Sequence, residues 1–155
     1  MPLVLNTIVT NIRKISDENF AGFEGFPADT NETALRWSVA VNDYAKSVIP
    51  ASISADVARV AFENIFKGIL PVPPTGLVVF PLAFTAYAVA LGLGMAPLFI
   101  AVPPPVPIII APVIPIGLGG DSAAVCATAL GTIIHLWFKT GTATSAAGGS
   151  PIPWS

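Results

Sequence analysis

The chain has 155 residues, the size of one ordinary domain, and 54% of them are hydrophobic while only 10% are charged. Typical soluble domains carry about 25% charged residues, so a monomer of this composition would expose large apolar patches, which usually mark association or membrane contact. The formal net charge of −2 supplies no basic field, so we expect no nucleic-acid partner. We interpret residues 1–155 as a single domain.

Residues 3–16 predict a short N-terminal helix. Their apolar side chains recur at helical spacing and leave the charged residues off the stripe. The β-branched residues of the same segment would also suit a strand.

Residues 30–68 predict a helical hairpin. Asp29, Thr30 or Asn31 can cap its first helix, in which Glu32 and Arg36 form an i,i+4 pair. We expect Pro50 to end that helix. The second helix has an apolar stripe and an edge of alternating charges, and the short link between the two helices makes them antiparallel neighbours.

The region from Gly68 to Gly120 contains no Asp, Glu, Lys or Arg. Residues 77–95 predict an apolar, alanine-rich helix in which Pro81 is tolerable as an early helical residue. Residues 97–120 predict a proline-rich extended arm, because four of the five residues from 103 to 107 are proline and exclude a helix there.

Residues 121–140 predict a C-terminal helix, and residues 141–155 a tail of small and polar residues that ends in Pro151-Ile152-Pro153-Trp154-Ser155. Leaving Trp154 in water is costly, so we expect it to latch either onto its own fold or onto a neighbouring subunit. Together these elements predict a mainly α fold, a small bundle of four or five helices with the proline-rich apolar arm.

No pattern of catalytic or metal-binding residues is present. Cys126 and His135 suggest a Cys–His pair, but nine residues along one helix separate them by about 13 Å. A core cysteine and a packed or interface histidine are the better interpretation. One histidine and one cysteine do not build a metal site in a single chain. We expect a protein that is not an enzyme and that has no cofactor and no metal.

The charge-free region must be buried in lipid or against protein. Residues 76–100 are uncharged and long enough to span a bilayer, whose core takes about 20 helical residues. The proline-rich half is equally apolar, but it cannot be helical and would leave its backbone unpaired in lipid. Burial against protein is therefore favoured over membrane spanning.

The chain resembles small virion proteins of tailed bacteriophages. The resemblance lies in three stretches: Thr33-Ala34-Leu35-Arg36-Trp37 to Tyr44-Ala45, Leu93-Gly94-Met95-Ala96-Pro97 to Pro103-Pro104-Pro105, and Trp137-Phe138-Lys139-Thr140-Gly141-Thr142 to Pro153-Trp154-Ser155. It implies a non-enzymatic tail or baseplate component, assembled in the host cytoplasm, whose partners are copies of itself and other virion proteins.

Two functions follow from these observations. The first is a structural assembly protein of a multi-subunit particle that buries apolar surface against its neighbours. The alternative is a small membrane protein, holin-like or pore-associated, with residues 76–100 in the bilayer. For the first, we expect the interface to use large apolar side chains and prolines of the charge-free region together with two tryptophans: Phe84, Tyr87, Leu91, Met95, Phe99, Pro103, Pro104, Pro105, Ile109, Trp137 and Trp154.

Overall fold

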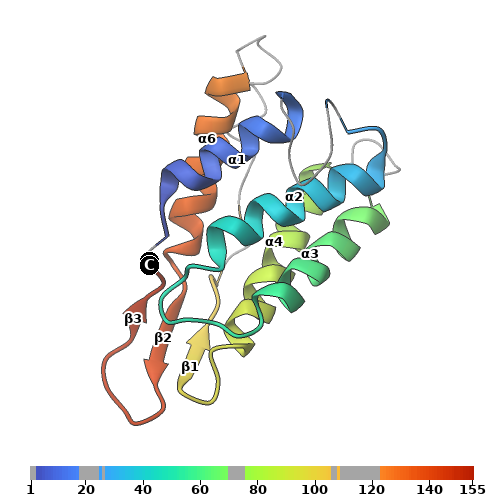
Figure 1. Cartoon of the computed structure of the whole chain (residues 1–155). Helices are drawn as coiled ribbons and strands as arrows, with labels where there is room; N and C mark the ends of the chain where they lie inside the picture. The colour runs from blue at the N-terminus through green and yellow to red at the C-terminus, as the bar shows by residue number, and fades with distance from the viewer. Residues whose placement is uncertain (1–2, 18–24, 26, 70–75, 106–107, 109–122) are drawn as a thin grey trace.

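The computed structural model describes residues 3–17, 25, 27–69, 76–105, 108 and 123–155. Within them the chain forms five helices and a small sheet at one end of the bundle (Figure 1). The elements in chain order are α1 (Leu5–Asp17), α2 (Thr30–Ala45), α3 (Ala55–Ile69), α4 (Gly76–Leu93), β1 (Phe99–Val102), α6 (Ala123–Phe138), β2 (Thr142–Ser145) and β3 (Ile152–Pro153). The predicted mainly α bundle is confirmed.

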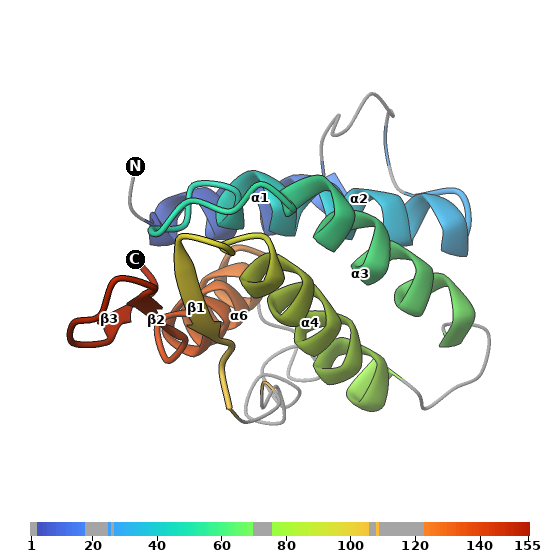
Figure 2. The ribbon, with the colours of Figure 1, turned by 90° about the horizontal axis from the view of Figure 1, so that it is seen from below.

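The first three helices pack in sequence order. α2 lies against both α1 and α3, α3 packs on α4, and α1 packs on α6. Asp29, one of the three predicted caps, caps α2 by accepting a hydrogen bond from the backbone N–H of Glu32 at 2.8 Å. The apolar stripes of these helices face one another, which buries Ile8 of α1, Val41 of α2 and Phe62 of α3. In Figure 2, α1 and α2 lie along one side of the bundle and α4 and α6 along the other.

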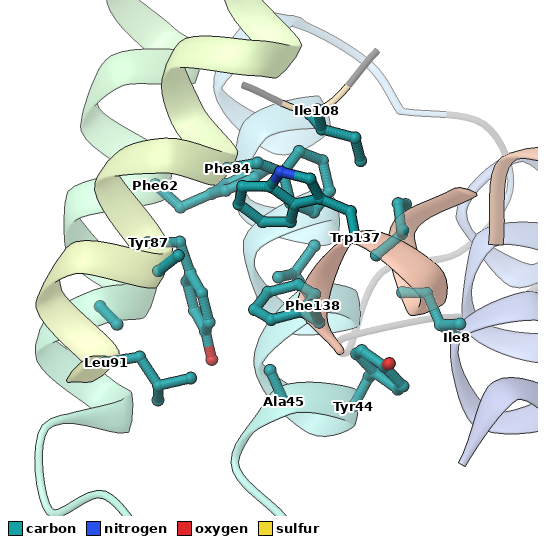
Figure 3. Packing of buried hydrophobic residues seen from close by; sticks show 14 of the residues in the cluster. Ile8, Tyr44, Ala45, Phe62, Phe84, Tyr87, Leu91, Ile108, Trp137 and Phe138 are labelled. Atoms are coloured by element: carbon teal, nitrogen blue, oxygen red, sulfur yellow. The ribbon is translucent and has the colours of Figure 1, made fainter. Parts of the chain in front are cut away.

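An aromatic cluster between α4 and α6 forms the centre of the core. Phe84 packs edge-to-face against Trp137 and lies 6.4 Å from Phe138, both on α6. Tyr87, one turn further along α4, contacts Phe138 with ring centroids 6.0 Å apart. Figure 3 shows these rings meeting between the two helices, with Ile108 beside them. α4 and α6 are therefore joined by aromatic burial although the chain between them is long.

A three-stranded antiparallel sheet closes one end of the bundle. Its strand order is β1-β2-β3, so β2 is central and β1 and β3 are edges (Figure 1). The tail returns to the fold beyond β3: the backbone N–H of Trp154 donates to the carbonyl of Gly141, and Ser155 pairs with Ile49 through two backbone hydrogen bonds. The Trp154 side chain is fully buried. Of the two predicted positions for Trp154, the structure shows the one on its own fold.

Three predicted boundaries differ from the structure. α2 ends at Ala45, before Pro50, because the backbone N–H of Lys46 makes the last helical hydrogen bond. The tail contains two strands that its small, polar residues did not predict, since β2 forms by pairing with β1, and β3 by pairing with β2. Residues 99–102 of the predicted arm form β1, whose pairing with β2 was not predicted, and Ile108 is buried; residues 106–107 and 109–120 of the arm lie outside the described residues.

α1 and α6 approach closely at Gly131. A Cβ at this position would lie 2.7 Å from Cγ2 of Val9 and 3.3 Å from its Cα and backbone N. The β-branched Val9 side chain has little freedom to move away in a helix. The contact therefore needs glycine.

Gly131→Ala should destabilise the fold by about 1–3 kcal/mol, the usual cost of overpacking a close contact. Gly68→Ala is the matched control, because Gly68 is also helical and a Cβ there meets nothing within 4 Å. The control should be neutral or up to about 1 kcal/mol more stable, since alanine favours helix. Urea unfolding followed by circular dichroism measures both; equal stabilities would contradict the close contact.

Trp154→Ala should cost about 3–5 kcal/mol, the range for emptying a site that holds a large buried ring. The indole packs on Phe138 and its Nε1–H donates to the carbonyl of Thr142. Ile152→Ala, on the exposed strand of the same tail, should cost much less. Thermal unfolding compares the two variants, and a loss from Trp154→Ala no larger than that from Ile152→Ala would show that the latch is not part of the stable fold.

Candidate interaction surface

α4 is apolar on its outer side as well as its inner side. The inner side is buried in the aromatic core. The outer side carries Leu82, Ala86, Val89 and Leu93, whose steps of four, three and four residues place them on one stripe. Leu93 at the end of this stripe is 73% exposed. A helix of this kind has no polar face to turn towards water.

The apolar surface continues from α4 into β1. Leu98, Ile100 and Val102 alternate along the extended chain, so their side chains point to the same face of the sheet. All three are more than half exposed. The intervening Phe99 and Ala101 point to the opposite face and are partly buried. Counted with Leu82, Val89 and Leu93, six large aliphatic side chains between 43% and 73% exposed belong to α4, β1 and the residue before β1.

A groove of about 470 Å³ lies between α4 and β1. Gly92 lies at its base: a Cβ there would be 3.2 Å from Cβ of Ala101 and 3.5 Å from the Trp154 ring. The latched tail therefore supports the groove from below. Its lining is almost entirely aliphatic and aromatic: Val89, Gly92, Leu93, Ala96, Phe99, Ile100, Ala101 and Pro103.

Charged groups lie away from this surface. No residue from 68 to 120 is charged, and ion pairs of the described residues are on α2, on α3 and just after α2. Glu63 on α3 forms ion pairs with both Arg59 and Lys67, and Lys46 forms one with Asp43. The residues that line the groove therefore carry no charge with which to hold a polar ligand.

The predicted interface residues fall into two groups. Six are buried by the chain itself and are covered before any partner binds: Phe84, Tyr87, Leu91, Met95, Trp137 and Trp154. Four lie along β1 and the prolines after it. Phe99 and Pro103 line the groove, Pro104 is buried and Pro105 is exposed. Ile109 lies outside the described residues.

The exposed apolar residues Val89, Leu93, Leu98, Ile100 and Val102 were not predicted. Large aromatic rings were expected at an interface, and in this fold they form the core. Two patterns in the sequence could have identified the exposed set: the helical stripe that ends at Leu93, and the alternation of large aliphatic residues from Leu98 to Val102.

Buried polar side chains serve the fold. Arg36 is completely buried; it pairs with Glu32 and donates to the carbonyls of Gly25 and Ile15. These bonds tie the end of α1 and the residue Gly25 to the second turn of α2. The backbone N–H of Ala28, which donates to Glu32, and then Arg36 hold the pKa of Glu32 below its ordinary value.

A second polar group joins three helices. The hydroxyl of Tyr87 on α4 donates to Oδ1 of Asn42 on α2 at 2.9 Å, and the amide of Asn42 lies 3.4 Å from Asp56 on α3. Burial raises the pKa of Tyr87 far above its ordinary value. Tyr87 therefore remains a neutral donor, and the group fixes the relative positions of the helices.

His135 contacts Tyr44 and not Cys126. The Tyr44 hydroxyl lies within hydrogen-bonding distance of Nδ1 of His135, at 2.8 Å. Burial raises the pKa of Tyr44, so the tyrosine is neutral in this contact. Within the described residues no group of three or more His, Cys, Asp or Glu side chains could hold a metal ion. The arrangement is that of a packed histidine.

Two further findings bear on function. In the part of the chain that the structure describes, no helix is both long enough and apolar enough to cross a membrane. Comparison of the chain with protein-family models, with curated proteins and with solved structures found no match.

Stability should fall as the pH drops below about 6.5, the ordinary pKa of histidine. Partial burial, and then Lys139, lower the pKa of His135 in the fold. The unfolded chain therefore takes up the proton first, and the stability contributed by neutral His135 is complete above that pH and is lost towards the folded pKa. The stability that ionised Glu32 contributes is lost only at lower pH, below about 4.5.

Urea unfolding from pH 8 to pH 5 measures this effect. His135→Gln, which has no titrating group at this position, should lose less stability over that interval than the natural chain. Identical pH profiles for the two proteins would contradict the assigned role of His135.

Proposed function

We propose that the chain is a non-enzymatic structural subunit of a multi-subunit particle, and that it works by burying the α4–β1 surface against neighbouring subunits. The observation that carries the proposal is the set of six large exposed aliphatic side chains on α4, β1 and the residue before β1, of which Val89, Leu93 and Ile100 line one groove; the set is Leu82, Val89, Leu93, Leu98, Ile100 and Val102. Monomeric proteins rarely expose apolar surface of this extent unless it is covered by a partner.

The free energies of burial and association favour a partner that is itself apolar. Burying a whole aliphatic side chain contributes about 1.5–3 kcal/mol, so covering the exposed halves of six contributes roughly 5–9 kcal/mol. Association costs about 4–15 kcal/mol in lost translational and rotational freedom. The free energy gained by covering one such surface with a polar partner therefore barely offsets the cost of association. When both partners bury an apolar surface, the gain doubles and exceeds most of the range of that cost.

The kind of particle is proposed from the sequence. The resemblance to virion proteins of tailed bacteriophages favours a tail or baseplate, where a short chain is covered on several sides by repeated neighbours. The lack of charge around the groove agrees with a permanent contact, because permanent interfaces are depleted of charge at their centre.

Leu93→Lys should weaken self-association or association with neighbouring subunits at least tenfold, because it places a charge that must be desolvated at the edge of the groove. Val57→Lys is the control: Val57 on α3 is 65% exposed, comparable to Leu93, and is not a groove residue. Sedimentation velocity over a range of protein concentrations, with circular dichroism to confirm folding, measures both. Equal association of the two variants would contradict the assigned surface.

The particle itself provides the second test. An antibody to the chain should detect it in stoichiometric copies in purified virions of the phage that encodes it. Recovery of the chain only with membranes, resistant to carbonate and high salt and requiring detergent, would overturn the proposal.

A further inference from the structure

The outer edge of β1 has backbone groups that no strand of the sheet pairs. The carbonyl of Leu98 accepts the N–H of Ala146 on the β2 side, at 2.9 Å. Hydrogen-bonding direction alternates along an antiparallel strand, so Leu98, Ile100 and Val102 bond to β2. Phe99 and Ala101 therefore direct their N–H and C=O groups away from β2, along the side of β1 that Figure 1 shows at the border of the sheet.

This edge has a small and specific hydrogen-bonding capacity. The N–H of Phe99 already donates to the carbonyl of Met95 at 3.1 Å, and Pro103 has no N–H. Over residues 99–103, all of which the structure describes, the N–H of Ala101 is then the donor directed outwards, with the carbonyls of Phe99 and Ala101 as acceptors. A long peptide strand laid on this edge would find no donor on either side of Ala101.

We propose that β1 pairs with β1 of a second copy of this chain, antiparallel and about a two-fold axis at Ile100. The N–H of Ala101 in each copy donates to the carbonyl of Phe99 in the other, so the donor on each edge is used. Two three-stranded sheets become one six-stranded sheet, and an exposed strand edge is removed from each copy. The inference rests on the proposed assembly function and identifies one partner in it.

The side chains favour this register. It places Ile100 opposite Ile100 of the second copy, and Leu98 opposite Val102, on the face of the sheet where all three are exposed. Such cross-strand aliphatic pairs are in direct contact. The second strand also enters the groove, whose other wall is formed by Val89 and Leu93. A like surface is the partner that supplies equal apolar area, and β1 and the residues that line the groove carry no charge that would repel it.

Cysteine cross-linking tests the axis. In a Cys126→Ser background, Ile100→Cys places two thiols opposite each other at a position without cross-strand hydrogen bonds, where Cα atoms are about 4.5 Å apart and a disulfide can form. Oxidised glutathione should convert most of the protein to a disulfide-linked dimer. Leu136→Cys on α6 is the control, because Leu136 is 61% exposed against 66% for Ile100; it should cross-link at least tenfold more slowly.

Proline substitution tests the hydrogen bonds. Ala101→Pro removes the outward N–H and leaves the bonds to β2 in place, since Ala101 is not a residue that bonds to that strand. The dimer dissociation constant should rise at least tenfold, with an unchanged circular dichroism spectrum. Ala101→Gly retains the N–H and should weaken the dimer much less. Sedimentation equilibrium measures both constants.

The outcomes separate this inference from the assembly function. If Ile100→Cys cross-links no faster than Leu136→Cys, or if Ala101→Pro and Ala101→Gly dimerise equally, pairing through β1 is wrong. The assembly proposal would still stand if Leu93→Lys impairs association and the chain is present in particles. A natural chain that is monomeric at every concentration tested would overturn the β1 pairing, while the particle experiment would decide the assembly function separately.

Discussion

Phe138 is the residue on which the tertiary structure most depends. Its ring contacts Tyr44 of α2, Phe84 and Tyr87 of α4, and Trp154 of the tail. These partners come from widely separated parts of the chain, so the contacts between them exist only once the bundle has closed. Aromatic rings bury large areas and prefer edge-to-face contact, which favours one arrangement of α4, α6 and the tail over other packings of equally apolar helices.

Polar groups make that arrangement unique. An apolar helix such as α4 can rotate against an apolar core at little cost, because one aliphatic side chain replaces another. The bond from Tyr87 to Asn42 removes this freedom, since any rotation would leave a buried hydroxyl and a buried amide without partners. Arg36 acts similarly between α1 and α2, where it satisfies Glu32 and two backbone carbonyls. Few charges are present, and several of them position helices.

The same aromatic core explains why the apolar surface lies where it does. Once Phe84 and Tyr87 turn inwards, Leu82, Val89 and Leu93 must turn outwards, because α4 has no polar side. The tail that buries Trp154 also brings β2 beside β1 and supports Gly92 at the base of the groove. Latching of the tail and formation of the proposed interaction surface are thus one structural event, and the groove depends on the integrity of the core beneath it.

Local sequence signals were sufficient for the helices. Periodicity and apolar composition located the helices, and the capping candidates at 29–31 placed the start of α2. Such signals act over a few residues, so one sequence contains them in full. The sheet had no comparable signal: residues 142–145 are small and polar, and they become a strand because β1 lies beside them.

For the candidate surface, too, the sequence identified one part and the tertiary structure decided the other. The charge-free region identified the part of the chain that water does not favour, since this is a property of composition. Which of its side chains form the core and which remain exposed was decided by the folding of α6 and the tail onto α4. The sequence favoured Tyr87 over Leu93 as an interface residue, and only the tertiary contacts show that Tyr87 is buried and that Leu93 is exposed. Burial depends on what lies opposite a side chain, and those neighbours are distant in sequence.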